Sequence, residues 1–197
     1  MTDLSVSQQQ LPVQVAGKTF ASRAWAYIID FVVYLLVTFV VSFVVGGVVG
    51  TVLSLAGREF QIVDDPSLKC INQIVGLFQF ALYFAIFEYF YGATLGKLVL
   101  GMRVIMTNGE PCTFGAAFVR SMFRYIDGLL FGLPAYNSMK DPLYQRLGDK
   151  SAKTIVVDAK DVIIQQPRDW WWFLIAAGLY LVLEVVVTLI LLSVSIR

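Results

Sequence analysis

Residues 24–45, AWAYIIDFVVYLLVTFVVSFVV, decide the fold of this chain, because 22 residues in a row carry one charge, that of Asp30. A helix needs about 20 predominantly apolar residues to cross a bilayer. Apolar residues continue past three glycines to Ala56, so the helix either extends that far or bends or breaks near its end. No cleavable signal peptide is visible before it, and we expect this stretch to be its own insertion signal.

Two further segments have the same character: residues 71–91, with Glu88 near the end, and residues 170–196, with Glu184 inside. Residues 57–70 between the first two segments are polar and predict a loop. Hydrophobic residues make up 58% of the chain, against about 45–50% in soluble domains. The sequence therefore predicts an integral membrane protein with three spans.

Basic residues predict its orientation. The N-terminal tail has Lys18 and Arg23, and residues 92–169 hold ten Lys or Arg, whereas the first loop has two such residues against three acids. By the positive-inside rule, the N-terminus and residues 92–169 are cytoplasmic and the C-terminus is outside. We expect a multi-pass protein of the cell (cytoplasmic or inner) membrane.

Residues 92–169 show a small fold of their own. Residues 98–106 (LVLGMRVIM) predict a strand closed by the turn signal Asn108-Gly109, and residues 154–157 a second strand that pairs with it. Thr113 is a plausible N-cap for a helix over residues 114–131. This helix has a wide apolar face and a narrow polar stripe, which favours a place in the membrane interface. The stripe consists of Arg120, Ser121, Arg124, Asp127 and Gly128.

An alternative makes residues 121–139 a fourth span. Arg124 and Asp127 would then lie at membrane depth, where charges are rare and costly, so we favour three spans. The predicted fold is an all-α integral membrane protein with three transmembrane helices, a cytoplasmic interfacial amphipathic helix and a small β pair. Its predicted parts are a polar tail (1–16), a membrane domain (17–158), a linker (159–169) and a C-terminal transmembrane helix (170–197).

Acids inside the spans are the main candidates for function. Arg23 and Asp30 are seven residues apart, which places them on one helical face about 10 Å apart. An acid in a span normally faces a partner or water. Asp30 therefore has two possible roles. Either it binds a cation or proton or, as we favour, it holds residues 92–169, the cytoplasmic module, against the spans through Arg120 or Arg124.

Glu184 lies about 21 Å along its segment, well inside the hydrocarbon. It shares a small and polar stripe with Ala177, Leu181, Thr188 and Ser195, which suits helix contact. Either the protonated acid donates a hydrogen bond across helices, or the ionised acid binds a translocating ion. Glu88 lies shallower, and we expect a structural role for it.

Several classes of function are disfavoured. The chain has no histidine, and its two cysteines, Cys70 and Cys112, form no metal-binding pattern. Residues 92–97 (GATLGK) are one residue short of a phosphate loop, and Leu98 stands where Ser or Thr would bind magnesium. We therefore expect no enzyme activity, no cofactor, no metal and no nucleic acid partner.

An ordered set of motifs resembles the RDD family of membrane proteins, named for one arginine and two aspartates. The motifs are Arg23-x6-Asp30, GATLGKLVLGMRVI (92–105), NGEP, RSMFRYID (120–127) and YQRLGDKSAKTIVV (144–157), and the resemblance covers residues 17–158. It implies that Arg23 and Asp30 are the family arginine and first aspartate. It implies Asp149 as the second aspartate, with Asp127 in reserve. The chain departs from the pattern at Lys153, where glycine is expected.

The resemblance implies two functions: monovalent cation and proton exchange, or assembly of membrane complexes. The first, together with the acids inside the spans, predicts a transport component that acts as an oligomer through Asp30 and Glu184. Glu184 lies beyond the region that resembles the family. The second predicts a non-catalytic scaffold held by a buried Arg/Asp network. The partners expected are the lipid bilayer, a second copy or another membrane protein, and monovalent cations. The candidate residues for an ion or proton site or a polar lock are Arg23, Asp30, Arg120, Arg124, Asp127, Asp149 and Glu184.

Overall fold

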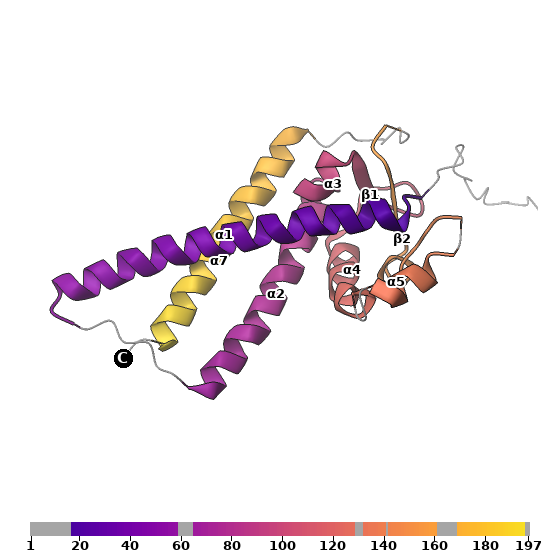
Figure 1. Cartoon of the computed structure of the whole chain (residues 1–197). Coiled ribbons are helices and arrows are strands. Elements are labelled where there is room, and N and C mark those ends of the chain that lie inside the picture. Colours follow the sequence, from indigo (N-terminus) through magenta and orange to yellow (C-terminus); the bar gives the residue numbers. More distant parts are fainter. Residues whose placement is uncertain (1–16, 59–64, 129–131, 141, 161–168, 196–197) are drawn as a thin grey trace, which may run out of the picture.

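The computed structural model describes residues 17–58, 65–128, 132–140, 142–160 and 169–195, and three long helices dominate it (Figure 1). They are α1 (Phe20–Leu55), α2 (Pro66–Phe90) and α7 (Trp170–Ser195). Each is long and apolar enough to cross a membrane. The three predicted spans are thus confirmed. The predicted tail (1–16) and most of the predicted linker lie outside the described residues.

The first span is one continuous helix. With 36 residues, α1 runs past all three glycines without a break, which settles the alternative left open by the sequence. At 1.5 Å per residue its length is about 54 Å, well beyond the hydrocarbon thickness of roughly 30 Å. The far end of α1 therefore extends beyond what a perpendicular span requires, as its reach in Figure 1 illustrates.

The second span begins earlier than expected. A loop was predicted as far as residue 70, but α2 already starts at Pro66. The Asp65 side chain accepts a hydrogen bond from the Ser67 backbone N–H at 2.7 Å. An acceptor at the N-cap and a proline in the first turn together favour a helix start here.

The predicted strand over residues 98–106 was too long. Residues Leu95–Val99 form a short helix, α3, and only Met102–Met106 form the strand β1. A turn at Gly101, whose φ is +61°, separates the two. The second strand, β2 (Thr154–Asp158), pairs antiparallel with β1 as predicted, with Val104 opposite Val156.

The amphipathic helix α4 (Phe114–Asp127) has its polar stripe turned inward. Thr113 caps it as predicted, since its side chain accepts from the Ala116 backbone N–H at 3.3 Å. Arg120 and Arg124 are buried, while Ile126 on the opposite side is 47% exposed. The outward apolar face supports the predicted place of α4 at the membrane interface.

A fourth span over residues 121–139 does not form. Helix α4 ends at Asp127, and α5 (Leu133–Ser138) is a separate helix of 6 residues. Within the described parts of the chain, the three long helices are the ones with the length and hydropathy of a span. Residues 129–131, where the predicted helix was to end, lie outside the described residues.

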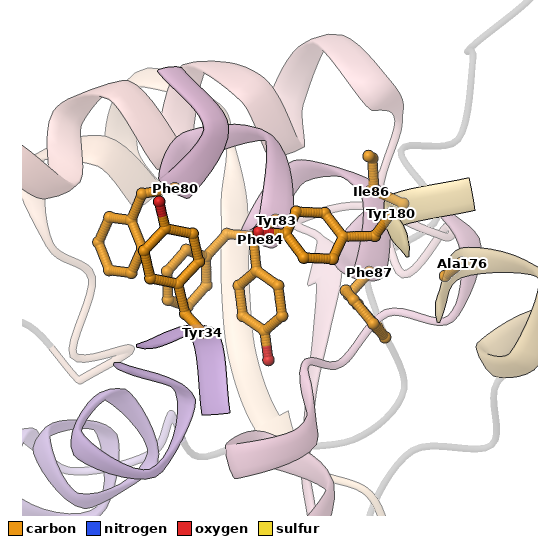
Figure 2. Packing of buried hydrophobic residues seen from close by; sticks show 8 residues of the cluster. All are labelled: Tyr34, Phe80, Tyr83, Phe84, Ile86, Phe87, Ala176 and Tyr180. Carbon is orange, nitrogen blue, oxygen red and sulfur yellow. The ribbon is translucent and has the colours of Figure 1, made fainter. Parts of the chain in front are cut away.

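An aromatic cluster joins the three spans. Its rings lie close together in Figure 2, with ring centroids 4.8 Å apart for Tyr34 of α1 and Phe80 of α2. Tyr83 of α2 and Tyr180 of α7 lie 5.2 Å apart. Edge-on aromatic pairs of this kind add packing energy beyond the area that they bury. The cluster therefore fixes α1, α2 and α7 to one another near α4, since Phe80 also contacts the Tyr125 ring.

Candidate functional site

Glu88 is the centre of a buried group of charges. It lies at the end of α2 and is completely buried. One carboxylate oxygen accepts from Lys97 Nζ at 2.7 Å and from Arg124 Nη2 at 3.3 Å, and the other accepts from Arg120 Nε at 3.0 Å. One carboxylate thus holds α2, α3 and α4 together.

Asp149 is a second centre, in the first turn of the short helix α6 (Leu147–Ser151). It pairs with Arg23 Nη1 of α1 and, at 3.0 Å, with Arg120 Nη1 of α4. Burial opposes ionisation of this carboxyl, but the guanidinium groups of Arg120, Arg146 and Arg23 outweigh it and hold the pKa of Asp149 well below its usual range. Asp149 therefore stays an anion.

Arg120 connects the two centres. It is completely buried, and its guanidinium contacts Glu88, Asp149 and the Thr154 hydroxyl, the last at 2.7 Å. A planar fork of donors suits such bridging better than an ammonium group does. We call this set of ion-paired residues the polar lock. Its members are Arg23, Glu88, Lys97, Arg120, Arg124 and Asp149.

Asp30 is held differently from our prediction. It is buried on the same face of α1 as Arg23, as their spacing predicted. Its described donors are the Thr94 hydroxyl at 2.5 Å, the Gly96 backbone N–H at 2.7 Å and the Tyr83 hydroxyl at 3.2 Å. The predicted ion pair with an arginine of α4 was wrong. The Asp30 side chain of α1 instead packs against the start of α3, where backbone N–H groups need an acceptor.

Gly96 permits this arrangement. A Cβ atom at this position would run into the Ala26 carbonyl oxygen of α1 and would lie 3.0 Å from the Asp30 carboxyl carbon. The GATLGK segment therefore presents the Gly96 N–H and the Thr94 hydroxyl to a carboxylate of the same chain. Its lysine, Lys97, turns to Glu88 instead. Burial lowers the pKa of Lys97 to about 8, and the Glu88 carboxylate limits that fall.

Asp127 is at the edge of the polar lock. Its nearest described cation is Arg146, at 3.9 Å from Nε to carboxylate oxygen. Burial raises the pKa of Asp127 above its usual value. This loose contact distinguishes it from Asp149, which has two close arginines.

Glu184 belongs to a separate polar cluster inside the spans. It is buried, and one of its oxygens accepts from Gln79 Nε2 at 3.0 Å and from the Tyr180 hydroxyl at 3.1 Å. The predicted contact stripe was partly wrong, since Leu181 is 45% exposed. The buried face of α7 runs through Ala176, Tyr180 and Glu184, at a spacing of four residues.

Sequence reasoning missed the importance of two lock residues. Glu88 was expected to have a structural role, but no partner was predicted for it, and Lys97 was considered only as part of a phosphate loop. An acid at the end of a span with a lysine shortly after it was the available signal. Lys153 adopts a φ of +51°, the left-handed region that favours glycine, so the turn before β2 keeps the glycine-like conformation that the family pattern predicts.

Among the described residues, no group of three or more His, Cys, Asp or Glu side chains is placed to hold a metal ion. Comparison with known proteins gave one family: the sequence model of the RDD family matches residues 18–153. No curated protein and no solved structure matches the chain. The match includes Arg23, Asp30 and Asp149 but ends before α7. Because it covers well over half of the 197 residues, the chain belongs to the RDD family of membrane proteins.

Proposed function

We propose that this protein is a non-catalytic scaffold or assembly subunit of a membrane complex, in which the polar lock fixes the cytoplasmic module to the spans. The observation that carries the proposal is Arg120. This fully buried guanidinium bridges Glu88, at the end of a span, and Asp149, in the module. Such a bridge sets the relative position of two parts of the chain.

The occupancy of the lock carboxylates also supports a structural role. Glu88 has three cationic partners and Asp149 has two close ones. A carboxylate that exchanges ions must be free to change partners, whereas breaking a buried pair costs about 3–5 kcal/mol. Asp30 likewise has three described donors.

The scaffold proposal is tested with Arg23→Gln and its control Arg103→Gln. Both remove one arginine charge, but Arg103 is partly exposed and stacks over the Tyr91 ring at 4.2 Å outside the lock. We expect Arg23→Gln to lower the melting temperature and the yield of partners cross-linked and purified from membranes. Full partner yield with Arg23→Gln, at normal expression, contradicts the proposal.

The orientation proposed with this function places the N-terminus and the lock in the cytoplasm and the C-terminus outside. The native cysteines make it testable, since Cys70, near the start of α2, is exposed and Cys112 is buried. A membrane-impermeant maleimide is expected to label Cys70 in intact cells, with Cys70→Ser as the control. Labelling only in inside-out vesicles means the reverse orientation.

A second candidate function is exchange of monovalent cations for protons by an oligomer. Glu184 favours it, because its second oxygen, Oε1, and the Thr38 hydroxyl are buried without a described hydrogen-bond partner. Acids at membrane depth are functional candidates by default. Purified protein in liposomes with a pH-sensitive dye tests this, with Glu184→Gln and Asp30→Asn as variants. Cation-driven proton flux that both variants abolish supports transport, and its absence in the wild type excludes it.

A further inference from the structure

A cavity of about 380 Å³ lies beside the polar lock, between the start of α1, the end of α4, α5 and α6. Its walls are mainly apolar and include Phe20, Tyr27 and Ile28 of α1. Three arginines line it as well, one each from α1, α4 and the start of α6. They are Arg23, Arg124 and Arg146.

Each of these arginines has hydrogen-bonding capacity left over. Arg23 and Arg124 are more than nine-tenths buried, at 7% and 6% exposure. Among the described residues, Arg23 Nη2, Arg124 Nε and Arg146 Nε have no hydrogen-bond partner. A buried donor without an acceptor costs about 1–3 kcal/mol, and more when it is charged. Both carboxylate oxygens of Asp127, on the same cavity wall, also have no hydrogen-bond partner among the described residues. Three arginine donors against this one carboxylate leave room for a further acceptor in the cavity.

The charge balance indicates the sign of that acceptor. The polar lock and its neighbours contain five cationic side chains and four carboxylates. The cations are Arg23, Lys97, Arg120, Arg124 and Arg146, and the acids are Asp30, Glu88, Asp127 and Asp149. At the cavity itself the balance is three arginines to one acid, Asp127. Burial and the neighbouring Arg146 lower the pKa of Arg124 to about 10, as expected where positive charges crowd together. The missing group is therefore an anion.

We propose that this cavity binds the phosphate of an anionic phospholipid, with one acyl chain along the exposed apolar face of α1. A guanidinium group can donate two parallel hydrogen bonds to the oxygens of one phosphate. Basic pockets on the cytoplasmic side of membrane helices bind lipid headgroups. The apolar walls favour a lipid over free phosphate, because an acyl chain can pack against them. From Ile28 on the cavity wall, the exposed apolar face continues along α1 through Val32 and Leu35, and these three side chains are 49%, 49% and 48% exposed.

The site goes beyond the proposed function and does not depend on it. The full chain in a neutral detergent is titrated with short-chain phosphatidylglycerol, phosphatidylcholine or inorganic phosphate, and thermal unfolding is followed. A ligand that binds only the folded state raises the melting temperature with concentration. We expect this rise with phosphatidylglycerol alone. An equal rise with phosphatidylcholine overturns the anion site, and an equal rise with inorganic phosphate overturns the lipid.

Arg146→Gln is the decisive variant, because the two ion pairs of Arg146 are long, at 3.8 and 3.9 Å. Loss of one charged hydrogen bond predicts about tenfold weaker lipid binding. The matched control is Lys150→Gln, which removes a charge from the same helix away from the cavity and leaves binding unchanged. Equal binding by all three proteins overturns the proposal.

A second variant leaves the charges intact. Ala24 is half-buried on the cavity wall, and Ala24→Leu fills part of the volume. We expect it to lose the phosphatidylglycerol effect while its melting temperature without lipid stays near that of the wild type. An undiminished lipid effect in this variant contradicts binding in the cavity. It therefore decides the matter even where Arg146→Gln fails to fold.

Discussion

Replacing Glu88 by glutamine is expected to destabilise this protein more than the loss of any exposed acid. The side chain is isosteric, so the change removes charge without creating a cavity. In the wild type, Lys97, Arg120 and Arg124 all donate to this carboxylate, at 2.7, 3.0 and 3.3 Å. The glutamine amide oxygen can still accept from one or two of these cations. The amide NH₂ group is itself a donor, so it cannot accept from the remaining one.

The size of the effect follows from burial. Glu88 and Arg120 have fully buried side chains, and those of Lys97 and Arg124 are 6% exposed, so water does not replace the lost anion. Breaking one buried ion pair costs about 3–5 kcal/mol. For a chain of 150–250 residues, each kcal/mol shifts the melting temperature by about 2–4 °C. We therefore expect a decrease of roughly 6–20 °C.

The measurement is thermal unfolding of purified protein in one detergent at pH 7. Glu110→Gln is the matched control, since Glu110 is exposed in the turn between β1 and Pro111, and it is expected to melt within about 1 °C of the wild type. The double variant Glu88→Gln/Lys97→Met is expected to recover part of the loss, because it also removes a stranded cation. A melting temperature of Glu88→Gln within about 2 °C of the wild type refutes the polar lock.

Three further predictions concern the part of the chain between α2 and α7. Lys97 has a pKa of about 8 when folded against its ordinary 10.5, so between these pH values the unfolded chain holds a proton that the folded protein lacks. Stability should therefore rise with pH across this window, and Lys97→Met should lack that rise in unfolding measured from pH 7 to 10. Gly96→Ala would push a methyl group into a carbonyl of α1 and should cost about 1–3 kcal/mol. By contrast, Gly115→Ala, with open space around it, should be neutral or stabilising by up to about 1 kcal/mol in the same denaturation assay. Lys153→Gly should raise the free energy of unfolding by up to about 1 kcal/mol, because φ is +51° and glycine adopts this region without strain. A lower stability of Lys153→Gly would contradict that account.

Local features of the sequence were enough for the span helices and the strand pair. Hydropathy predicted all three spans, and the turn signal Asn108-Gly109 and the Thr113 cap placed β1 and α4. At the start of the predicted first strand, a distant residue was responsible for the failure. Residues Leu95–Val99 form a helix rather than a strand start because the Asp30 carboxylate of α1 accepts the Gly96 N–H.

In the candidate site, too, the sequence predicted most of the residues but not how they pair. Arg23, Arg120, Arg124 and Asp149 were predicted as charged residues that needed partners, and the structure brings them together. Their partners were not predicted, since no partner was assigned to Glu88, and Asp30 was expected among the ion pairs. Asp127 and Glu184 lie apart from this set, one at its edge and one in a cluster of its own.

The sequence by itself determined that this chain crosses a membrane, which three segments form its spans, and which family it belongs to. These properties depend on the transfer of neighbouring residues into lipid, a local energy that adds along the chain. Only the tertiary structure decided which charges meet, because Arg23 and Asp149 are 126 residues apart and their attraction depends on distance and burial in space. The same is true of the cavity lined by arginines from separate helices.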